Sequence, residues 1–318
     1  MTRFRDSAPL DDSAEAAAAL LGDVDAETLA KDYWVTEALR ALADEYSGYF
    51  AFKGGTSLTK ALHCVDRFSE DIDVLITGKP ADMSFDRLMK SMAASVSDST
   101  GLKGERVGGT TNVWRSVRFV YPTRHAAVLR PEIILEMGVR GSDTPEHVVR
   151  DIEPLLAGVQ QEGFDSSMFV DLGPFPVDVL HPARTLWEKV VLLHTDVTTG
   201  LWKEREPSRF VRHYGDIGAL LRLHEAKEAL GDPTLRSRLD WDVREVSERW
   251  FGSEPPPVPD GGYARSDAFE PSDEFGEYLE EHFVQTVEVL WAPSDRPSLE
   301  SIIEVVQESA VILDPTSE

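Results

Sequence analysis

The chain is poor in cysteine, in long apolar runs and in positive charge. A single cysteine, Cys64, among 318 residues excludes an intramolecular disulfide and a cysteine-cluster zinc site. No apolar run approaches the ~20 residues that span a bilayer, and the acidic N-terminus with its short apolar patch at 16–21 does not resemble a signal peptide. We therefore expect a cytoplasmic protein that does not enter a membrane.

The net charge of −25 argues against a broad nucleic-acid surface, because clustered Lys and Arg drive phosphate binding. The cations are nevertheless unevenly spread. Two local basic groups contain Arg106, Arg115, Arg118, Arg124, Arg130 and Arg140, and then Lys203, Arg205, Arg209 and Arg212. Trp202 precedes the second group and would be available to stack on a base. The alternative is that these cations pair with the many surrounding acids.

The stretch 53–74 is the most informative in the chain, and its first half has the pattern of a phosphate-binding turn. An apolar strand at 50–52 meets two glycines, and a helical pattern follows over 58–65. Glycines let the backbone approach an anion, hydroxyl side chains can cap the helix, and a lysine one turn in can reach a phosphate. The candidate nucleotide-binding residues are Gly54, Gly55, Thr56, Ser57 and Lys60.

The second half places two acids beside an apolar strand. Asp71 and Asp73 are two residues apart, so they share one face of that strand, roughly 6.6 to 6.8 Å apart at Cα. Oxygen ligands of this kind suit Mg²⁺, with Mn²⁺ as the alternative ion. Each half is common alone, but their separation allows one helix between two adjacent strands and puts both groups at one edge of a sheet.

Glu136 offers a third carboxylate in the apolar run 132–139, which is a plausible neighbouring strand. If this run pairs beside the strand that carries Asp73, Glu136 can act as a general base or support the metal. The alternative is a structural ion pair with Arg140.

Hydrophobic periodicity predicts an α/β (α+β) protein with a mixed sheet and a helical C-terminal part. Two helices are expected over 13–46, the second beginning near Asp25. A helix at 84–97 and strands at 103–109, 113–121 and 130–139 follow. Helices continue over 181–250, and a Pro-rich break at 254–262 precedes helices at 271–291 and 298–312. The expected domains are 1–48 (N-terminal helices), 49–180 (catalytic module), 181–252 (helical domain completing the active site) and 253–318 (linker and C-terminal helices).

Four motifs occur in the order found in a known family. They are KDYWV at 31–35, the block from GGTS at 54–57 to SEDID at 69–73, RTLWEK at 184–189, and RHYGDI at 212–217. Together they resemble the AbiEii/MenT nucleotidyltransferase toxins of the polymerase-β-like superfamily. The resemblance implies a polymerase-β-like nucleotidyltransferase module and covers most of residues 31–220.

The resemblance also implies roles for individual residues. Gly55, Ser57, Asp71 and Asp73 would form the nucleotide and metal site. Lys189 would bind the triphosphate, and Asp216 would complete the catalytic set. Gly215 departs from the pattern, which more often has a bulky aromatic or polar residue there, and glycine inside a helix costs about 1 kcal/mol relative to alanine. Helical spacing alone places Lys189 on a solvated face and makes Asp216 a surface acid paired with Arg212.

The expected activity is Mg²⁺-dependent transfer of a nucleotide from a nucleoside triphosphate to an acceptor, with release of pyrophosphate. The resemblance implies a toxin of a toxin–antitoxin or phage-defence system, with the 3′ end of transfer RNA as acceptor and a cognate antitoxin as partner. One alternative is transfer of a nucleotide or phosphate to a protein hydroxyl, on the antitoxin or on the chain itself at Ser57. The other is a non-catalytic nucleotide-binding module.

Overall fold

The computed structural model describes residues 2–7, 9–22, 24–67, 71–124, 129–159, 166–252, 254–271, 273–291 and 295–317. The chain divides into two compact units. The first consists of Met1–Ala61, Phe68–Val139 and Val148–Val179, and the second of Leu62–Arg67, Arg140–His147 and Leu180–Glu318. The chain therefore leaves the first unit after Ala61, contributes six residues to the second, and returns.

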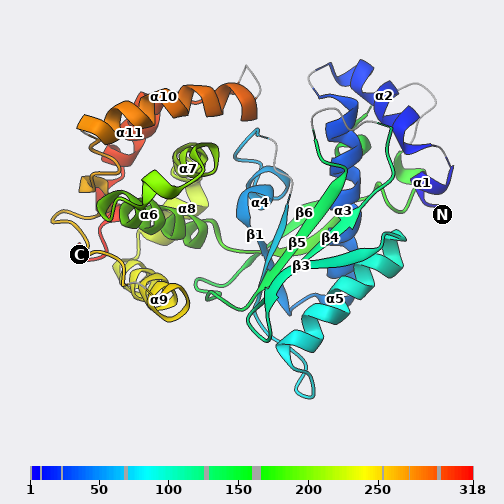
Figure 1. The fold of residues 1–318 in the computed structure, drawn as a ribbon, viewed down its shortest axis with the longest axis horizontal. Helices are drawn as coiled ribbons and strands as arrows, with labels where there is room; N and C mark the ends of the chain where they lie inside the picture. The colour runs from blue at the N-terminus through cyan, green and yellow to red at the C-terminus, as the bar shows by residue number, and fades with distance from the viewer. Residues whose placement is uncertain are drawn as a thin grey trace. The chain divides into compact units, whose positions relative to one another are not determined.

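The first unit is built on one mixed sheet, in which the described residues form seven strands (Figure 1). The strands are β1 Phe50–Lys53, β2 Ile72–Ile76, β3 Gly104–Thr110, β4 Trp114–Val120, β5 Glu132–Gly138, β6 Val148–Ile152 and β7 Phe175–Val179. Their order is β3-β4-β5-β2-β1-β7-β6, with β1/β7 and β2/β5 parallel and the other pairs antiparallel. This sheet with its helices confirms the predicted α/β class.

Helices cover one face of this sheet. The α-helices of the first unit are α1 Phe4–Ser7, α2 Leu10–Leu21, α3 Ala26–Tyr46, α4 Gly54–Lys60 and α5 Phe85–Thr100. The α3 helix begins where predicted, because the Asp25 carboxylate accepts a hydrogen bond from the Thr28 amide at 2.7 Å. Both α3 and α5 pack against the sheet, on the side of its buried residues Val74 and Met137.

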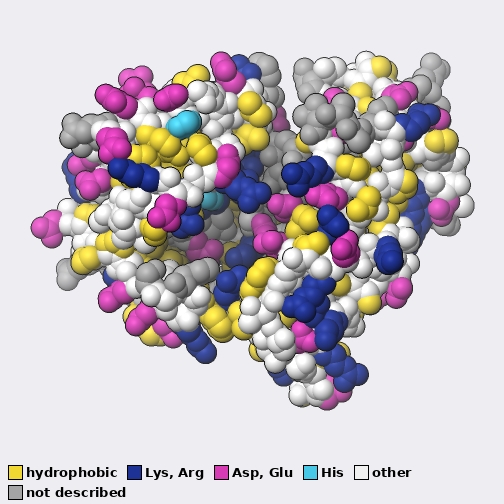
Figure 2. All heavy atoms as spheres, viewed as in Figure 1, with side chains coloured by type: hydrophobic (Ala, Val, Ile, Leu, Met, Phe, Trp, Pro, Cys, Tyr) yellow, Lys and Arg dark blue, Asp and Glu magenta, His cyan; other side chains and the backbone are white. Residues whose placement is uncertain are grey.

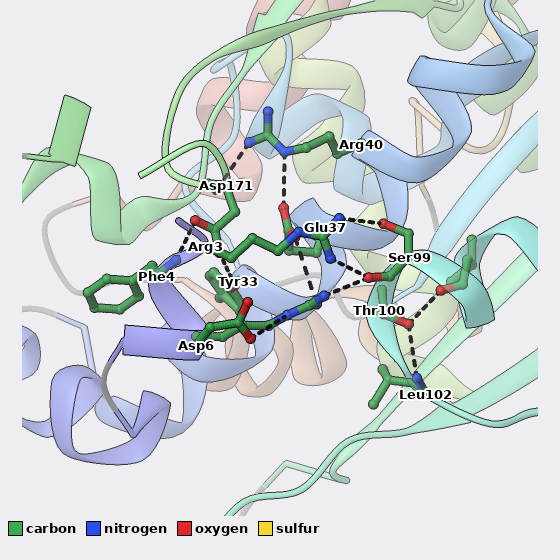
Figure 3. Close-up of polar contacts among 12 residues, drawn as sticks. Arg3, Phe4, Asp6, Tyr33, Glu37, Arg40, Ser99, Thr100, Leu102 and Asp171 are labelled. Atoms are coloured by element: carbon green, nitrogen blue, oxygen red, sulfur yellow. Dashed lines mark hydrogen bonds and ion pairs between the residues drawn. The ribbon is translucent and has the colours of Figure 1, made fainter. Parts of the chain in front are cut away.

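A buried polar cluster fastens the N-terminus to α3 in the first unit (Figure 3). The Asp171 carboxylate accepts hydrogen bonds from the Phe4 amide at 2.7 Å and from the Tyr33 hydroxyl. The Arg40 guanidinium donates to Glu37 at 3.0 Å and to the Asp171 carbonyl at 3.1 Å. Glu37 is only 2 % exposed, and this burial raises the pKa of its carboxyl.

The second unit is helical. Its helices are α6 Pro182–Thr198, α7 Pro207–Leu220, α8 His224–Leu230, α9 Pro233–Phe251, α10 Asp273–Leu290 and α11 Leu299–Glu308. Proline opens α6, α7 and α9, where its missing N–H costs no intrahelical hydrogen bond. The α7 helix packs against α6, α10 and α11. The segment Leu62–Arg67 joins this unit, and Arg67 forms an isolated antiparallel bridge with Trp291.

The predicted helix at 58–65 is wrong in its bounds, because α4 begins at Gly54 and ends at Lys60. Gly54 adopts a φ of +76°, which turns the chain directly from strand to helix. The strands β6 and β7 were not predicted. Pro176 lies inside β7, and proline argues against a strand interior. None of the described helices is long and apolar enough to cross a membrane.

Candidate active site

Three charged residues lie side by side across the centre of the first unit's sheet. Asp73 on β2 is the register partner of Lys53 on β1 and of Glu136 on β5. Register partners share a face of the sheet. Asp71 lies two residues before Asp73 and directly precedes β2. Ile72 points to the opposite face and is fully buried. Asp71 and Glu136 are exposed and Asp73 is half-buried, so two carboxylates lie on this face and a third lies at the start of β2.

The first glycine of the turn lies directly against one of these carboxylates. A Cβ built on Gly54 would lie 2.2 Å from Oδ2 of Asp73, well inside van der Waals contact. Gly54 also has a positive φ of +76°, which other residues adopt only with strain. This position therefore requires glycine for two independent reasons, and the predicted turn and acid pair lie together as expected.

Two hydroxyl groups fasten the turn. The Thr56 hydroxyl donates to the Asp71 carbonyl at 2.5 Å, which ties α4 to the start of β2. The buried Ser57 hydroxyl donates to the Gly54 carbonyl at 2.8 Å. Lys60 ends α4, and its ammonium lies 2.5 Å from Oδ1 of Asp32. A phosphate at Lys60 would have to compete with that ion pair.

The second unit contains a buried ion cluster around Asp216 of α7. The side chain of Asp216 is fully buried, and its two oxygens accept hydrogen bonds from Nε and Nη2 of Arg67 at 2.9 and 3.0 Å. The Lys189 ammonium on α6 donates to the same carboxylate at 2.9 Å and lies 3.2 Å from Nδ1 of His213. Two cations therefore converge on one carboxylate.

The charges of this cluster set its protonation. Burial alone would raise the pKa of Asp216, but Lys189 and Arg67 outweigh it and hold that pKa below its usual range. Burial lowers the pKa of Lys189, and the Asp216 charge opposes this shift. Burial and the Lys189 charge lower the pKa of His213 well below its ordinary value, so the imidazole is neutral at pH 7. Asp216 is therefore an ionised anchor and a weak base.

The helix-surface placements suggested by spacing are wrong for both residues. Lys189 on α6 and Asp216 on α7 are both buried, because they pair with each other and Asp216 also pairs with Arg67. Sequence reasoning missed Arg67 as a member of this cluster. The feature that could have identified Arg67 is its position four residues before Asp71, inside the block that carries the family resemblance.

The donor set of the first unit suits a divalent ion that also binds substrate. Among the described residues, no three or more His, Cys, Asp or Glu side chains are grouped to hold a metal alone. Asp73 on β2 and Asp71 directly before it supply hard oxygen donors. Mg²⁺ commonly takes one or two carboxylates together with phosphates and water, so two acids are compatible with it.

The basic groups are largely engaged by acids. In the first, Arg115 contacts Asp86 at 2.8 Å and Arg118 contacts Glu105 at 2.6 Å. Figure 2 shows Lys and Arg side chains interspersed with Asp and Glu on the viewed face.

The second basic group behaves in the same way. Lys203 contacts Glu274 at 2.8 Å, and Arg205 contacts Asp196 at 2.7 Å. The expectation that Trp202 is available to stack on a base is wrong. Its ring is buried 4.6 Å from that of Tyr278, because its apolar surface is packed inside the helical unit.

Comparisons with known proteins identify the family of this chain. The family model described as nucleotidyl transferase AbiEii toxin, type IV toxin–antitoxin system, matches residues 37–304. A search of curated proteins finds no match. The fold is similar to that of MenT4, a nucleotidyltransferase toxin from Mycobacterium tuberculosis, with a TM-score of 0.53 and 17 % identity, over 94 % of this chain and 89 % of that chain. The chain belongs to the AbiEii family of nucleotidyltransferase toxins, as its motifs predicted.

Proposed function

We propose that this nucleotidyltransferase uses Mg²⁺ to transfer a nucleoside monophosphate from a nucleoside triphosphate to an acceptor hydroxyl. The observation that carries the proposal is the contact of Gly54 with Asp73, which sets a phosphate-type turn against an acid pair. Glu136 lies beside Asp73 on the neighbouring strand. Substrate phosphates and carboxylates need to share an ion in this reaction class.

In this proposal, Asp71 and Asp73 hold the ion, and Gly54, Gly55, Thr56 and Ser57 bind the phosphates. The ion would neutralise charge on the transferring phosphate and on the leaving pyrophosphate. Thr56 and Ser57 are buried, and their hydroxyls are bonded to backbone carbonyls. We therefore assign the phosphate contacts to backbone amides of the turn.

The chemical step exchanges one bond to the α-phosphorus for another. The acceptor oxygen bonds to the α-phosphorus, the bond from that phosphorus to the oxygen bridging to the β-phosphorus breaks, and this oxygen leaves with the electron pair in pyrophosphate. The hydroxyl proton passes to a base. We assign this role to exposed Glu136 rather than Asp216, because two cations lower the pKa of Asp216.

Lys189 binds the triphosphate in this scheme, and Asp216 orients its ammonium. The support is chemical: Lys189 is held at 2.9 Å by a carboxylate and at 3.2 Å by a neutral imidazole. Such contacts fix the direction of a long flexible side chain, which favours positioned contact with a charged substrate.

The acceptor we propose is the 3′ end of transfer RNA, and the setting is a cytoplasmic toxin–antitoxin or phage-defence system with a cognate antitoxin protein. The family membership and the motif resemblance support this choice. A protein hydroxyl is the competing acceptor. Ser57 is a poor one, because its hydroxyl is buried and already donates to the Gly54 carbonyl.

The test is transfer from each α-labelled nucleoside triphosphate in the presence of Mg²⁺ and total transfer RNA, with RNA and protein resolved on a gel. We expect label in RNA, and loss of label when periodate oxidation destroys the 3′-terminal hydroxyls. Asp73→Asn should lower transfer at least about 100-fold, which is ~2.7 kcal/mol in the barrier.

Glu105→Gln is the matched control, since Glu105 is an exposed acid of the same sheet and pairs with Arg118. It should transfer at the native rate. Label in protein would replace RNA by a polypeptide acceptor. Absence of label from both would contradict the proposed reaction.

A further inference from the structure

One aromatic side chain from the C-terminal helices lies against the Asp216 cluster. Trp291 follows α10 directly and is buried. A Cβ added to Gly215 would lie 2.7 Å from Cζ2 of the Trp291 indole, so the ring occupies the space where a side chain at 215 would stand. The departure from the family pattern at 215 thus coincides with an aromatic ring supplied from elsewhere in the chain.

The same residue also holds Arg67. The backbones of Arg67 and Trp291 form an antiparallel bridge, and the Arg67 guanidinium lies 5.7 Å from the centre of the indole ring. The other side of this guanidinium is bonded to both oxygens of Asp216. Backbone pairing, a cation–π contact and a bidentate ion pair therefore fix one arginine.

We propose that Trp291 is a positioning residue: it fills the space beside Gly215 and clamps Arg67, and through Arg67 it fixes Asp216 and Lys189. Only the expected effect of Trp291 on catalysis rests on the proposed function; its contacts with Gly215 and Arg67 do not. Loss of the ring would free the Arg67 guanidinium on one side and open a cavity beside α7. The Lys189 ammonium would then lose a fixed partner, because Asp216 would no longer be held from two directions.

Cys64 supplies a readout that does not depend on catalysis. It is the single cysteine, it belongs to the clamped segment Leu62–Arg67, and it is half-buried. Burial and the nearby Asp216 charge raise the pKa of its thiol to about 12. Undocking of the segment would expose the thiol and return its pKa toward the ordinary range, so it would react faster with a disulfide reagent.

The experiment compares Trp291→Ala with Phe283→Ala in the full chain. Phe283 is a buried aromatic of α10 about two turns earlier, roughly 12 Å along the axis, and serves as the matched control for general loss of packing. We expect Trp291→Ala to speed Cys64 labelling by 5,5′-dithiobis(2-nitrobenzoic acid) at least about tenfold in the folded protein, and Phe283→Ala and Trp291→Phe to label near the native rate. Equal labelling in both alanine variants would overturn the proposal.

The second measurement is the Tm of Gly215→Ala, made with and without Trp291→Ala. Gly215→Ala should lower Tm in the native background, where the methyl group meets the indole ring. It should raise Tm in Trp291→Ala, where the space is open and alanine favours the helix. Additive shifts in Tm would contradict direct contact between the two positions.

The catalytic readout follows if transfer is detected. Trp291→Ala should raise KM for the nucleoside triphosphate at least about fivefold relative to Phe283→Ala, because Lys189 is misplaced. If the native chain transfers no nucleotide, the proposed function fails, while thiol labelling and the Tm cycle still decide the clamp.

Discussion

We propose roles in the reaction for both Asp73 and Asp216, and their surroundings differ. Asp73 is half-buried on its sheet face, with Glu136 beside it on one strand and Lys53 on the other. Asp216 is fully buried between Arg67 and Lys189. Asp73 therefore has one acid and one cation beside it, whereas two cations of the protein bind Asp216 directly.

This difference separates two roles that the motifs do not distinguish. Neighbouring acids repel each other, and a bound divalent cation relieves that repulsion. A carboxylate that already binds two cations has little attraction left for a third. The sheet face is therefore suited to a metal and a phosphate, and the buried cluster is suited to fixing the direction of Lys189.

The largest effect expected from this contrast is on stability. Asp216→Asn should lower the free energy of unfolding of the second unit by about 3–5 kcal/mol, because it leaves two buried cations without their counter-charge. Asp73→Asn should change stability by less than about 1 kcal/mol, because Asp73 is only half-buried and asparagine has nearly the same volume. Calorimetry or urea unfolding would measure the stability change of each variant. The data should be fitted with one or two unfolding transitions, because the two units can unfold separately.

Equal losses from the two substitutions would remove the contrast. Glu105→Gln, with its exposed acid, gives the baseline for loss of one surface charge.

A comparison of alanine substitutions at two glycines tests the role of the sheet face in the reaction. Gly54 and Gly101 both have a φ of +76°, but a Cβ at Gly101 meets nothing within 4 Å, whereas one at Gly54 lies 2.2 Å from the Asp73 carboxylate. Each substitution by alanine should cost about 1–2 kcal/mol of stability through backbone strain. Gly54→Ala should in addition displace Asp73 and lower nucleotide transfer at least about tenfold, which is ~1.4 kcal/mol.

Gly101→Ala should transfer at the native rate once its folded fraction is matched. Similar transfer by both variants would show that the close approach of Gly54 to Asp73 has no part in the reaction.

The smallest expected effect concerns pH and contrasts Asp216 with Glu37, the buried carboxyl of the first unit. Burial raises the pKa of Glu37, so its contribution to stability falls as pH rises from about 4.5 through its folded pKa. The pKa of Asp216 is lowered, so its contribution is complete above pH ~4 and is lost on further acidification. Glu37→Gln should remove the part of the stability loss above about pH 4.5 that comes from ionisation of Glu37.

Urea unfolding at pH 5, 6 and 7 would measure this slope. The glutamine side chain can still accept the hydrogen bond from Arg40, so packing is conserved. An unchanged slope in Glu37→Gln would place the pH dependence on another group.

Much of the fold could be predicted because its strongest elements depend on local pattern. The α3 helix has its cap at Asp25 and its buried stripe from Leu29 onward, and strands β3, β4 and β5 lie within two residues of the predicted bounds. Strands β6 and β7 could not be found, because β7 contains Pro176 and is stabilised by pairing with the distant β1. Tertiary pairing outweighs local propensity there.

In the candidate site, too, local pattern could be predicted and tertiary contacts could not. The glycine turn and Asp73 belong to one strand–turn–helix–strand unit, so spacing predicted that they share an edge of the sheet, but it did not predict the close approach of Gly54 to Asp73. Helical periodicity wrongly placed Lys189 and Asp216 at the surface, because it cannot foresee that Arg67, from the segment between α4 and β2, belongs to the helical unit. The resemblance singled out both residues without revealing their burial or their partner.

The central claim is that the sheet acids bind the metal with the nucleotide. The most direct test is a Mn²⁺ titration followed by electron paramagnetic resonance, with a non-hydrolysable nucleoside triphosphate present. We expect bound Mn²⁺ in the native chain and in Glu105→Gln, and at least about tenfold weaker binding in Asp73→Asn with its fold intact. Binding of Mn²⁺ to Asp73→Asn with native affinity would contradict the claim.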